Sequence, residues 1–183
     1  MRRIELPNDH DIPRLMAEDL QANRIIMGGV ESKDVRKETV GVRGFMQAVL
    51  RRKDGSVMYH AQPNLIVNGG WDLLCNVLGL NSQPSDLTHI AVGTGTTAAA
   101  AAQTTLVTEL ARLTATYAHT AGTMSCTFTR NFGAGQGTGA LTEAGLFNAA
   151  SAGTMFNRVV FDVVNKQAGD TLAMTFTITF AAG

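Results

Sequence analysis

The sequence predicts a mainly β protein, with an antiparallel β-sandwich or jelly-roll-like body, one short helix and an extended N-terminal arm. Apolar residues alternate with threonine and serine in several short runs, which is the period-two pattern of half-buried strands. Glycine-rich segments separate these runs, as expected of an antiparallel fold with many turns. Most basic residues precede them, since eleven of the fifteen Lys and Arg lie in the first sixty residues. We therefore assign residues 1–40 to the arm and residues 41–183 to the body.

The arm combines a helical pattern with an apolar segment. Asp11 suits a helix N-cap and Pro13 suits the first turn, so we expect a short amphipathic helix that ends near Leu20. Apolar residues then flank a Gly-Gly pair, although a solvated tail would not need them. These residues are Ile25, Ile26, Met27 and Val30. Two interpretations stay open: a disordered leader, or an arm that docks on a neighbouring subunit through these side chains.

A hairpin and a helix open the body. Residues 42–50 have a strand pattern, residues 53–56 (Lys-Asp-Gly-Ser) form a turn signal, and residues 57–61 return. The helix is expected after the Asn-Gly-Gly segment at 68–70, with Gly79 as its C-cap. Its apolar residues are Trp71, Leu74, Cys75, Val77 and Leu78. We expect Cys75 and Cys126 to be small buried hydrophobic residues, because they are far apart and sit in apolar surroundings.

The remaining chain has the pattern of short strands joined by loops. Strands are expected at 88–92, 124–132, 141–147, 156–164 and 172–180, and either a strand or a helical turn at 106–113. Loops are expected at 98–102, which has no polar face, and at the glycine-rich segment 133–139. In the last strand Thr175, Thr177 and Thr179 alternate with apolar residues. One face of this strand should therefore join the core, and the other should form a ladder of threonines.

The body is nearly free of charge, which favours association. Only ten charged side chains lie between residues 61 and 183, whereas a free monomeric protein usually keeps a mixed charged surface. We expect subunits that cover one another in a homo-oligomer, and specifically a trimer. Threonine suits such contacts because it offers a methyl and a hydroxyl without a desolvated charge. The candidate assembly residues are Ile25, Ile26, Met27 and Val30 of the arm and Thr175, Thr177 and Thr179 of the last strand.

No motif in the sequence supports catalysis, a cofactor or a metal. Residues 93–98 (Gly-Thr-Gly-Thr-Thr-Ala) match the spacing of a dinucleotide-binding fingerprint, but the parallel strand–helix–strand unit and the later acidic residue that it requires do not follow. An inter-strand loop is the better interpretation. The histidines are isolated, without ligand spacing. Glu143 and Asp162 are the acids within the late strands, and Arg130 and Arg158 are expected to pair with them. We expect a non-enzymatic protein.

Composition also argues against two kinds of partner. The formal net charge is zero, so there is no general attraction to nucleic acid or to an anionic membrane. No run approaches the roughly eighteen apolar residues of a membrane span, and the N-terminus lacks the apolar region of a signal peptide. We therefore expect a protein that is made, and assembles, in a cytoplasm.

Three segments, taken together and in order, resemble a known family. The segments are 64–74 (Asn-Leu-Ile-Val-Asn-Gly-Gly-Trp-Asp-Leu-Leu), 87–112 with its Val-Gly-Thr-Gly-Thr-Thr and Glu-Leu-Ala-Arg motifs, and 141–180 from Leu-Thr-Glu-Ala-Gly-Leu-Phe-Asn to Thr-Phe-Thr-Ile-Thr-Phe. This order is similar to that of small structural, tail-fibre-like virion proteins of tailed bacteriophages, over residues 42–181. The resemblance implies a β-rich virion subunit with no catalytic residue to transfer. It does not extend to the arm.

Three functions follow as expectations, and they differ in their partners. The first is a homo-oligomeric virion protein that is attached to the tail or neck through its arm and assembled in the host cytoplasm. The second is a capsid cement or decoration protein bound over the head lattice. The third is a receptor- or carbohydrate-binding fibre module, which would favour aromatic residues exposed on loops. An enzyme would instead need a deep polar pocket around Glu143, Asp162 and His119.

Overall fold

The computed structural model describes residues 26–27, 30–31, 40–79 and 85–182, and it confirms a mainly β fold with one helix. The body comprises Val40–Ala182. Its elements are β3 (Val40–Arg51), β4 (Val57–Ile66), α2 (Asn68–Gly79), β5 (His89–Gly93), β6 (Glu109–Thr114), β7 (Thr116–His119), β8 (Ser125–Phe132), β9 (Gly139–Phe147), β10 (Met155–Lys166) and β11 (Thr171–Ala182). Before the body, β1 (Ile26–Met27) pairs with β2 (Val30–Glu31) in antiparallel fashion. The helix expected near residues 11–20 lies outside the described residues.

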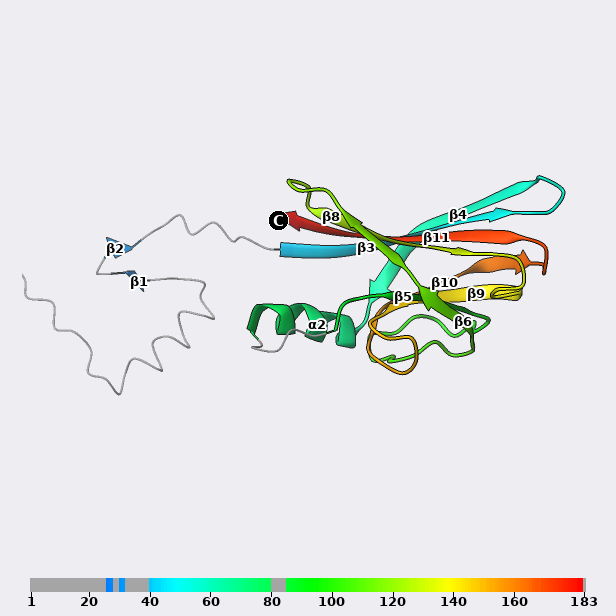
Figure 1. Cartoon of the computed structure of the whole chain (residues 1–183). Helices are drawn as coiled ribbons and strands as arrows, with labels where there is room; N and C mark the ends of the chain where they lie inside the picture. Colours follow the sequence, from blue (N-terminus) through cyan, green and yellow to red (C-terminus); the bar gives the residue numbers. More distant parts are fainter. Residues whose placement is uncertain (1–25, 28–29, 32–39, 80–84, 183) are drawn as a thin grey trace, which may run out of the picture. The chain divides into compact units, whose positions relative to one another are not determined.

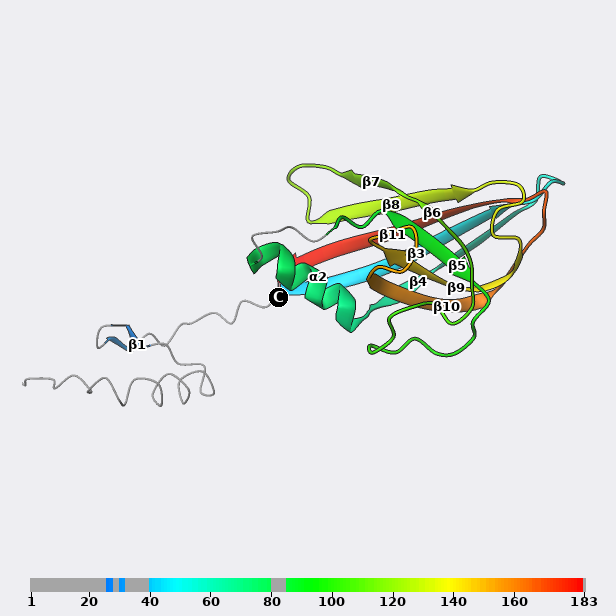
Figure 2. The ribbon, with the colours of Figure 1, turned by 60° about the horizontal axis from the view of Figure 1, so that its bottom comes forward.

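The nine strands of the body form one antiparallel sheet in the order β6-β5-β9-β10-β4-β3-β11-β8-β7. β6 and β7 lie at opposite edges of this order, although only Ala115 separates them in the chain. The two edges must therefore meet, and the sheet bends into a nearly closed, barrel-like structure (Figure 1; Figure 2). Arg130 on β8 links the edges, because its Nη1 donates to the carbonyl of Thr114 on β6 at 3.4 Å.

β4 joins the two halves of the sheet. Its residues 57–64 lie in register with β3, whereas Leu65 and Ile66 lie in register with β10. One half is therefore β4-β3-β11-β8-β7, and the other is β6-β5-β9-β10. The inward side chains of both halves form the main core, which includes Met46, Leu50, Phe128, Met174 and Phe176 from the first half and Ile90, Leu146, Phe156, Val159 and Phe161 from the second.

The outer surfaces of the two halves differ. In the second half, the segment between β5 and β6 (residues 94–108, here the β5–β6 loop) covers the outer side of the strands. A second cluster of buried apolar side chains lies beneath it: Val67, Ala91, Leu106, Phe147 and Met155. On the outer side of the first half, threonines and apolar residues are exposed or half-buried. One outer surface is therefore covered by a loop, and the other is open to solvent.

Helix α2 lies against β10 through glycine. The carbonyl of Val67 accepts hydrogen bonds from the backbone N–H groups of Gly70 and Trp71, which starts the helix one residue after β4 ends. A Cβ atom at Gly70 would collide with the carbonyl of Phe156 on β10, so glycine lets the two backbones approach. Cys75, expected to be buried, is instead exposed on this helix, while Cys126 is half-buried. Leu73 and Leu74 of the helix are half-buried against the main core, whereas Trp71, Val77 and Leu78 are exposed.

Two elements differ from the sequence expectation. β7 was not predicted, because its four residues are all exposed and show no apolar alternation; it forms because it is paired with β8. The strand expected at 57–61 runs on to Ile66 through Pro63. Of the two possibilities for residues 106–113, the strand is correct and begins at Glu109, whereas Leu106 lies buried in the preceding loop.

Candidate functional site

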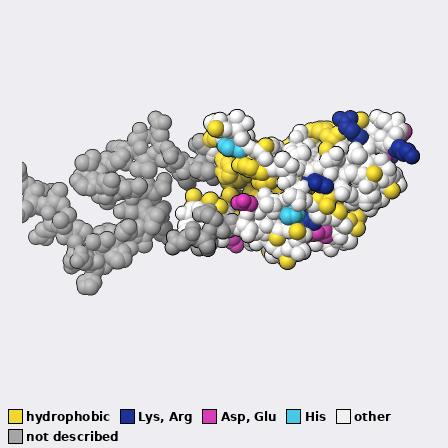
Figure 3. All heavy atoms as spheres, in the orientation of Figure 1, with side chains coloured by type: hydrophobic (Ala, Val, Ile, Leu, Met, Phe, Trp, Pro, Cys, Tyr) yellow, Lys and Arg dark blue, Asp and Glu magenta, His cyan; other side chains and the backbone are white. Residues whose placement is uncertain are grey.

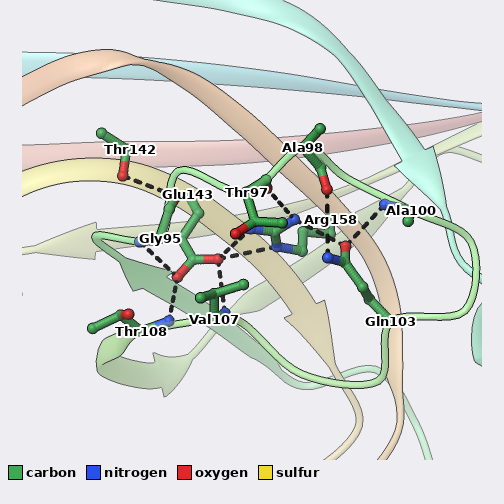
Figure 4. A network of polar contacts seen from close by, with 10 residues as sticks. All are labelled: Gly95, Thr97, Ala98, Ala100, Gln103, Val107, Thr108, Thr142, Glu143 and Arg158. Carbon is green, nitrogen blue, oxygen red and sulfur yellow. Dashed lines mark hydrogen bonds and ion pairs between the residues drawn. The ribbon is translucent and has the colours of Figure 1, made fainter.

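Glu143, which was expected to pair with an arginine, lies against Arg158. The two residues lie on neighbouring strands, β9 and β10, and both side chains are fully buried. Arg158 donates from Nε and Nη2 to Oε2 of Glu143, at 3.0 and 2.8 Å (Figure 4). The pair points to the outer side of the second half of the sheet, beneath the β5–β6 loop. It is an ion pair enclosed by protein.

Glu143 also holds the β5–β6 loop by its backbone. Oε1 accepts from the N–H groups of Gly95 at 2.9 Å and Thr108 at 2.7 Å, and Oε2 accepts from the N–H of Val107 at 3.0 Å. The carboxylate therefore binds both ends of the loop at once. A Cβ atom at Gly95 would lie 2.5 Å from Oε1, so the glycine permits this approach. The Gly-Thr-Gly segment thus serves a carboxylate of its own chain, and the interpretation of residues 93–98 as an inter-strand loop is confirmed.

Arg158 completes the network on the other side. Its Nη1 donates to the carbonyl of Thr97 and to Oε1 of Gln103, each at 2.9 Å. Gln103 in turn accepts from the N–H of Ala100, and the hydroxyl of Thr142 donates to the carbonyl of Gly95 (Figure 4). The polar groups of the pair thus find partners either in each other or in the loop, as a buried charge requires. The arrangement fixes the loop and leaves no gap for a substrate between the two charges.

The surroundings of Glu143 determine its ionisation. Burial alone would raise the pKa of this carboxyl group, but hydrogen bonds from Thr108, Val107, Arg158 and Gly95 outweigh burial and hold the pKa below the ordinary value of 4.5. Glu143 is therefore a carboxylate near neutral pH. A general acid works best with a pKa raised toward the working pH, so this environment favours a structural role.

The lowered pKa predicts how stability depends on pH. A carboxyl group with a depressed pKa in the folded protein contributes stability that is present above its unfolded pKa and is lost as pH falls through its folded pKa. The free energy of unfolding should therefore decrease as the pH is lowered below about 4.5. The difference between the wild type and a Glu143→Gln variant should also shrink at low pH, because protonated Glu143 resembles glutamine. Urea unfolding between pH 3 and pH 7 measures both; a difference that stays constant over this range would contradict the assignment.

The other candidate catalytic residues do not converge. Asp162 is exposed on β10, and Arg130, the other arginine expected to pair with one of these acids, instead donates to the carbonyl of Thr114. His119 lies exposed at the end of β7, with Nδ1 2.8 Å from the carbonyl oxygen of Ser125. Within the described residues there is no group of three His, Cys, Asp or Glu that could hold a metal ion, and no helix is long and apolar enough to cross a membrane.

A cavity of about 560 Å³ lies beside α2, and its lining is mainly apolar. Leu73 and Leu74 of the helix, Phe156 of β10 and Phe180 of β11 form much of its wall. None of Glu143, Asp162 and His119 lines it. It is therefore a different feature from the polar pocket that an enzyme built on those three residues would need.

The threonine ladder lies where the sequence predicted it, on the outer side of the first half of the sheet. Thr175, Thr177 and Thr179 are half-buried on β11, opposite Thr129, Thr127 and Ser125 of β8. We call the surface to which they belong the outer face. It consists of Thr116 and Ala118 on β7, Ser125, Thr127, Thr129 and Asn131 on β8, Thr171, Ala173, Thr175, Thr177 and Thr179 on β11, Arg43, Phe45, Gln47, Val49 and Arg51 on β3, and Val57, Tyr59, Ala61, Pro63 and Leu65 on β4.

The outer face changes character from one edge to the other. Hydroxyls dominate β8 and β11, where the Oγ1 atoms of Thr129 and Thr175 lie 3.2 Å apart. On β4 every outward residue is apolar or aromatic, and Tyr59 is 60% exposed. Among the residues that make up the outer face, the charged ones are Arg43 and Arg51, both on β3. Few charged side chains also appear on the side of the body seen in Figure 3.

The threonines of this face were predicted from the sequence, whereas its apolar residues on β4 were not. The signal was present, because Val57, Tyr59, Ala61, Pro63 and Leu65 alternate with Met58, His60, Gln62 and Asn64. Pro63 argued against extending the predicted strand through these residues, since proline is rare within a strand. Of the arm candidates, Ile26 and Met27 lie in β1 and Val30 lies in β2, while Ile25 lies outside the described residues.

Comparison with known proteins adds no relative. No family model, curated protein or solved structure matches this chain.

Proposed function

We propose that this chain is a non-enzymatic structural subunit of a tailed-bacteriophage virion, which packs against copies of itself through the outer face and is attached to the tail or neck through its N-terminal arm. The outer face carries the proposal. The order of sequence motifs over residues 42–181, which resembles that of small virion proteins, supports the location in a particle.

The outer face suits contact between subunits because little has to be desolvated to bury it. Interface cores are depleted in charge and enriched in aromatic residues, and this face has Phe45 and Tyr59 with arginines only at positions 43 and 51. Threonine hydroxyls can pair with each other across strands, as Thr129 and Thr175 do. In a symmetric homo-oligomer, the expected trimer included, each such surface is used by every subunit.

Two other roles compete with attachment to the tail or neck. A capsid decoration protein would use the same surface, and it would differ in copy number. A carbohydrate-binding fibre module would favour aromatic residues on loops, but the single tryptophan lies on α2 and the two tyrosines lie on β4 and β7. These positions favour assembly over sugar recognition.

Quantitative mass spectrometry of purified virions tests the proposal. A few to a few dozen copies per particle is the result expected for a tail or neck subunit, whereas on the order of hundreds would identify a protein that decorates the icosahedral head. Absence from particles would overturn the virion role altogether. A purified chain that stays monomeric at high concentration would overturn packing through the outer face.

A further inference from the structure

Among the described residues, one side of β4 has no partner strand over most of its length. Val57–Asn64 pair with β3, but on the opposite side the described pairing is limited to Leu65 and Ile66, which pair with Arg158 and Asn157 of β10. No strand within the described residues pairs with 57–64 on that side. Figure 1 shows the reason, because the hairpin of β3 and β4 turns away from β10 toward its tip.

The position of Pro63 shows which backbone groups face this open side. In an antiparallel pair, residues alternate between those that bond to the partner strand and those whose N–H and C=O point away from it. Proline has no N–H, and Pro63 lies opposite Phe45 at a position that points away from β3. With a period of two, the N–H and C=O groups of Val57, Tyr59 and Ala61 also point away from β3. We call these three residues the open edge.

The open edge lacks the usual protection of an unpaired strand. Natural edges carry charges, bulges or proline that hinder pairing with another chain. Val57, Met58 and Tyr59 are instead 54%, 39% and 60% exposed, so both faces of the strand tip are accessible. Pro63 protects only the inner end, where the side chain of Gln62 also donates to the carbonyl of Val160 and bridges toward β10. An accessible stretch of strand remains from Val57 to Ala61.

We propose that the open edge pairs with the open edge of a second copy, antiparallel and centred on Tyr59, so that two sheets continue into one across a two-fold axis. In this register Val57 lies opposite Ala61 of the second copy, which uses all three residues and keeps Pro63 out of the ladder. The two tyrosines become a cross-strand aromatic pair, a favourable combination. An antiparallel arrangement also keeps the two basic turns apart, since Arg52 and Lys53 lie beyond Val57 in each copy and Arg51 lies opposite Val57 on β3.

This inference rests on self-association, which is part of the proposed function, and adds a two-fold contact to it. Alone the contact gives a dimer; combined with a three-fold contact through the threonine-rich part of the outer face, it closes into a hexamer if the two axes meet at a right angle. A second copy is the occupant that the edge fits best, because the same short apolar stretch serves both partners and no like charges oppose each other.

Disulfide cross-linking tests the register. Tyr59→Cys, in a Cys75→Ala background that removes the exposed native thiol, should form a disulfide-linked dimer under mild oxidation. Opposed Cα atoms in an antiparallel pair lie about 4.5–5.5 Å apart, which is within the range of a disulfide. Val57→Cys is the matched control, because its symmetry mate lies four residues along the strand, about 14 Å away. Mixing the Val57→Cys and Ala61→Cys proteins should restore the cross-link.

Adding Ala61→Pro to the Tyr59→Cys protein should abolish the cross-link, because proline removes an N–H of the open edge. The thermal midpoint should stay nearly unchanged, since this N–H points away from β3. The control variant Ala61→Ser keeps the N–H and should leave the cross-link intact. Two results would overturn the edge contact alone. One is equal cross-linking of the Tyr59→Cys and Val57→Cys variants, and the other is no cross-linking in samples that light scattering shows to be associated. Samples that are monomeric at every concentration overturn both this contact and the packing on which it rests.

Discussion

Replacing Glu143 by glutamine is expected to lower the free energy of unfolding by about 3–5 kcal/mol, because it leaves the buried guanidinium of Arg158 without a counter-charge. Glutamine keeps the shape of the side chain and one acceptor oxygen. Its amide group, however, would face donors, since Oε2 accepts from both Arg158 and the N–H of Val107. Native domains are stable by only about 5–15 kcal/mol, so the variant should be close to the limit of folding. Urea unfolding with circular dichroism measures the change.

The pair of Glu109 and Arg112 provides a matched control. It is also an Arg–Glu pair, with an Nη2–Oε2 distance of 2.6 Å, but the Glu109 side chain is 31% exposed. Arg112 keeps other contacts without it, since Nη1 donates to the carbonyls of Ala149 and Ala152 and the guanidinium lies 3.6 Å from the centre of the Phe147 ring. Glu109→Gln should therefore cost no more than about 1 kcal/mol. If Glu143→Gln lowers the free energy of unfolding no more than Glu109→Gln does, the enclosed network does not hold the body together.

The loss of stability in the Glu143→Gln variant should be largest in the β5–β6 loop. Glu143 binds the N–H groups of Gly95, Val107 and Thr108, so the β5–β6 loop depends on one carboxylate at both of its ends. In a Glu143→Gln protein that still folds, hydrogen exchange in residues 94–108 should rise more than in β11. This pattern separates loss of the loop from a general loss of stability.

The alternation of apolar and polar residues predicted most of the fold. It placed the strand at 172–180 with Phe176 inside and Thr177 outside, because a strand with one buried face must alternate. Scarcity of charge also predicted a partner for Glu143, since an acid in an apolar strand needs one. Sequence did not reveal which arginine would serve or that the Gly95 N–H would contribute, because both depend on how the β5–β6 loop folds back over β9 and β10.

The missed features depend on tertiary context. β7 has no amphipathic signal of its own and exists as a strand through its pairing with β8. The open side of β4 could not be read from its residues, because it depends on where β10 diverges after Asn157 and Arg158. Local pattern therefore predicted which face of each strand is buried, but not which edges of the sheet lack a partner.

Replacing Thr177 by lysine is expected to weaken self-association about 30-fold or more, which corresponds to about 2 kcal/mol for an ammonium group buried in a contact without a counter-charge. Thr177 is half-buried in the middle of the outer face, between Thr127 of β8 and Phe45 of β3. The neighbouring strands bring no acidic side chain to this face, so the new charge would have no counter-charge within its own subunit. Sedimentation equilibrium over a range of protein concentrations measures the association constant.

Thr104→Lys is the control for this effect, because it makes the same chemical change at an exposed residue of the β5–β6 loop, on the other half of the sheet. Both variants should unfold at nearly the wild-type temperature, since an outward strand position contributes at most about 1 kcal/mol through its β propensity. If Thr177→Lys associates as strongly as Thr104→Lys, the threonine-rich part of the outer face does not lie between subunits. Assembly would then have to depend on the apolar residues of β4, where a lysine at Tyr59 would be the substitution that separates the copies.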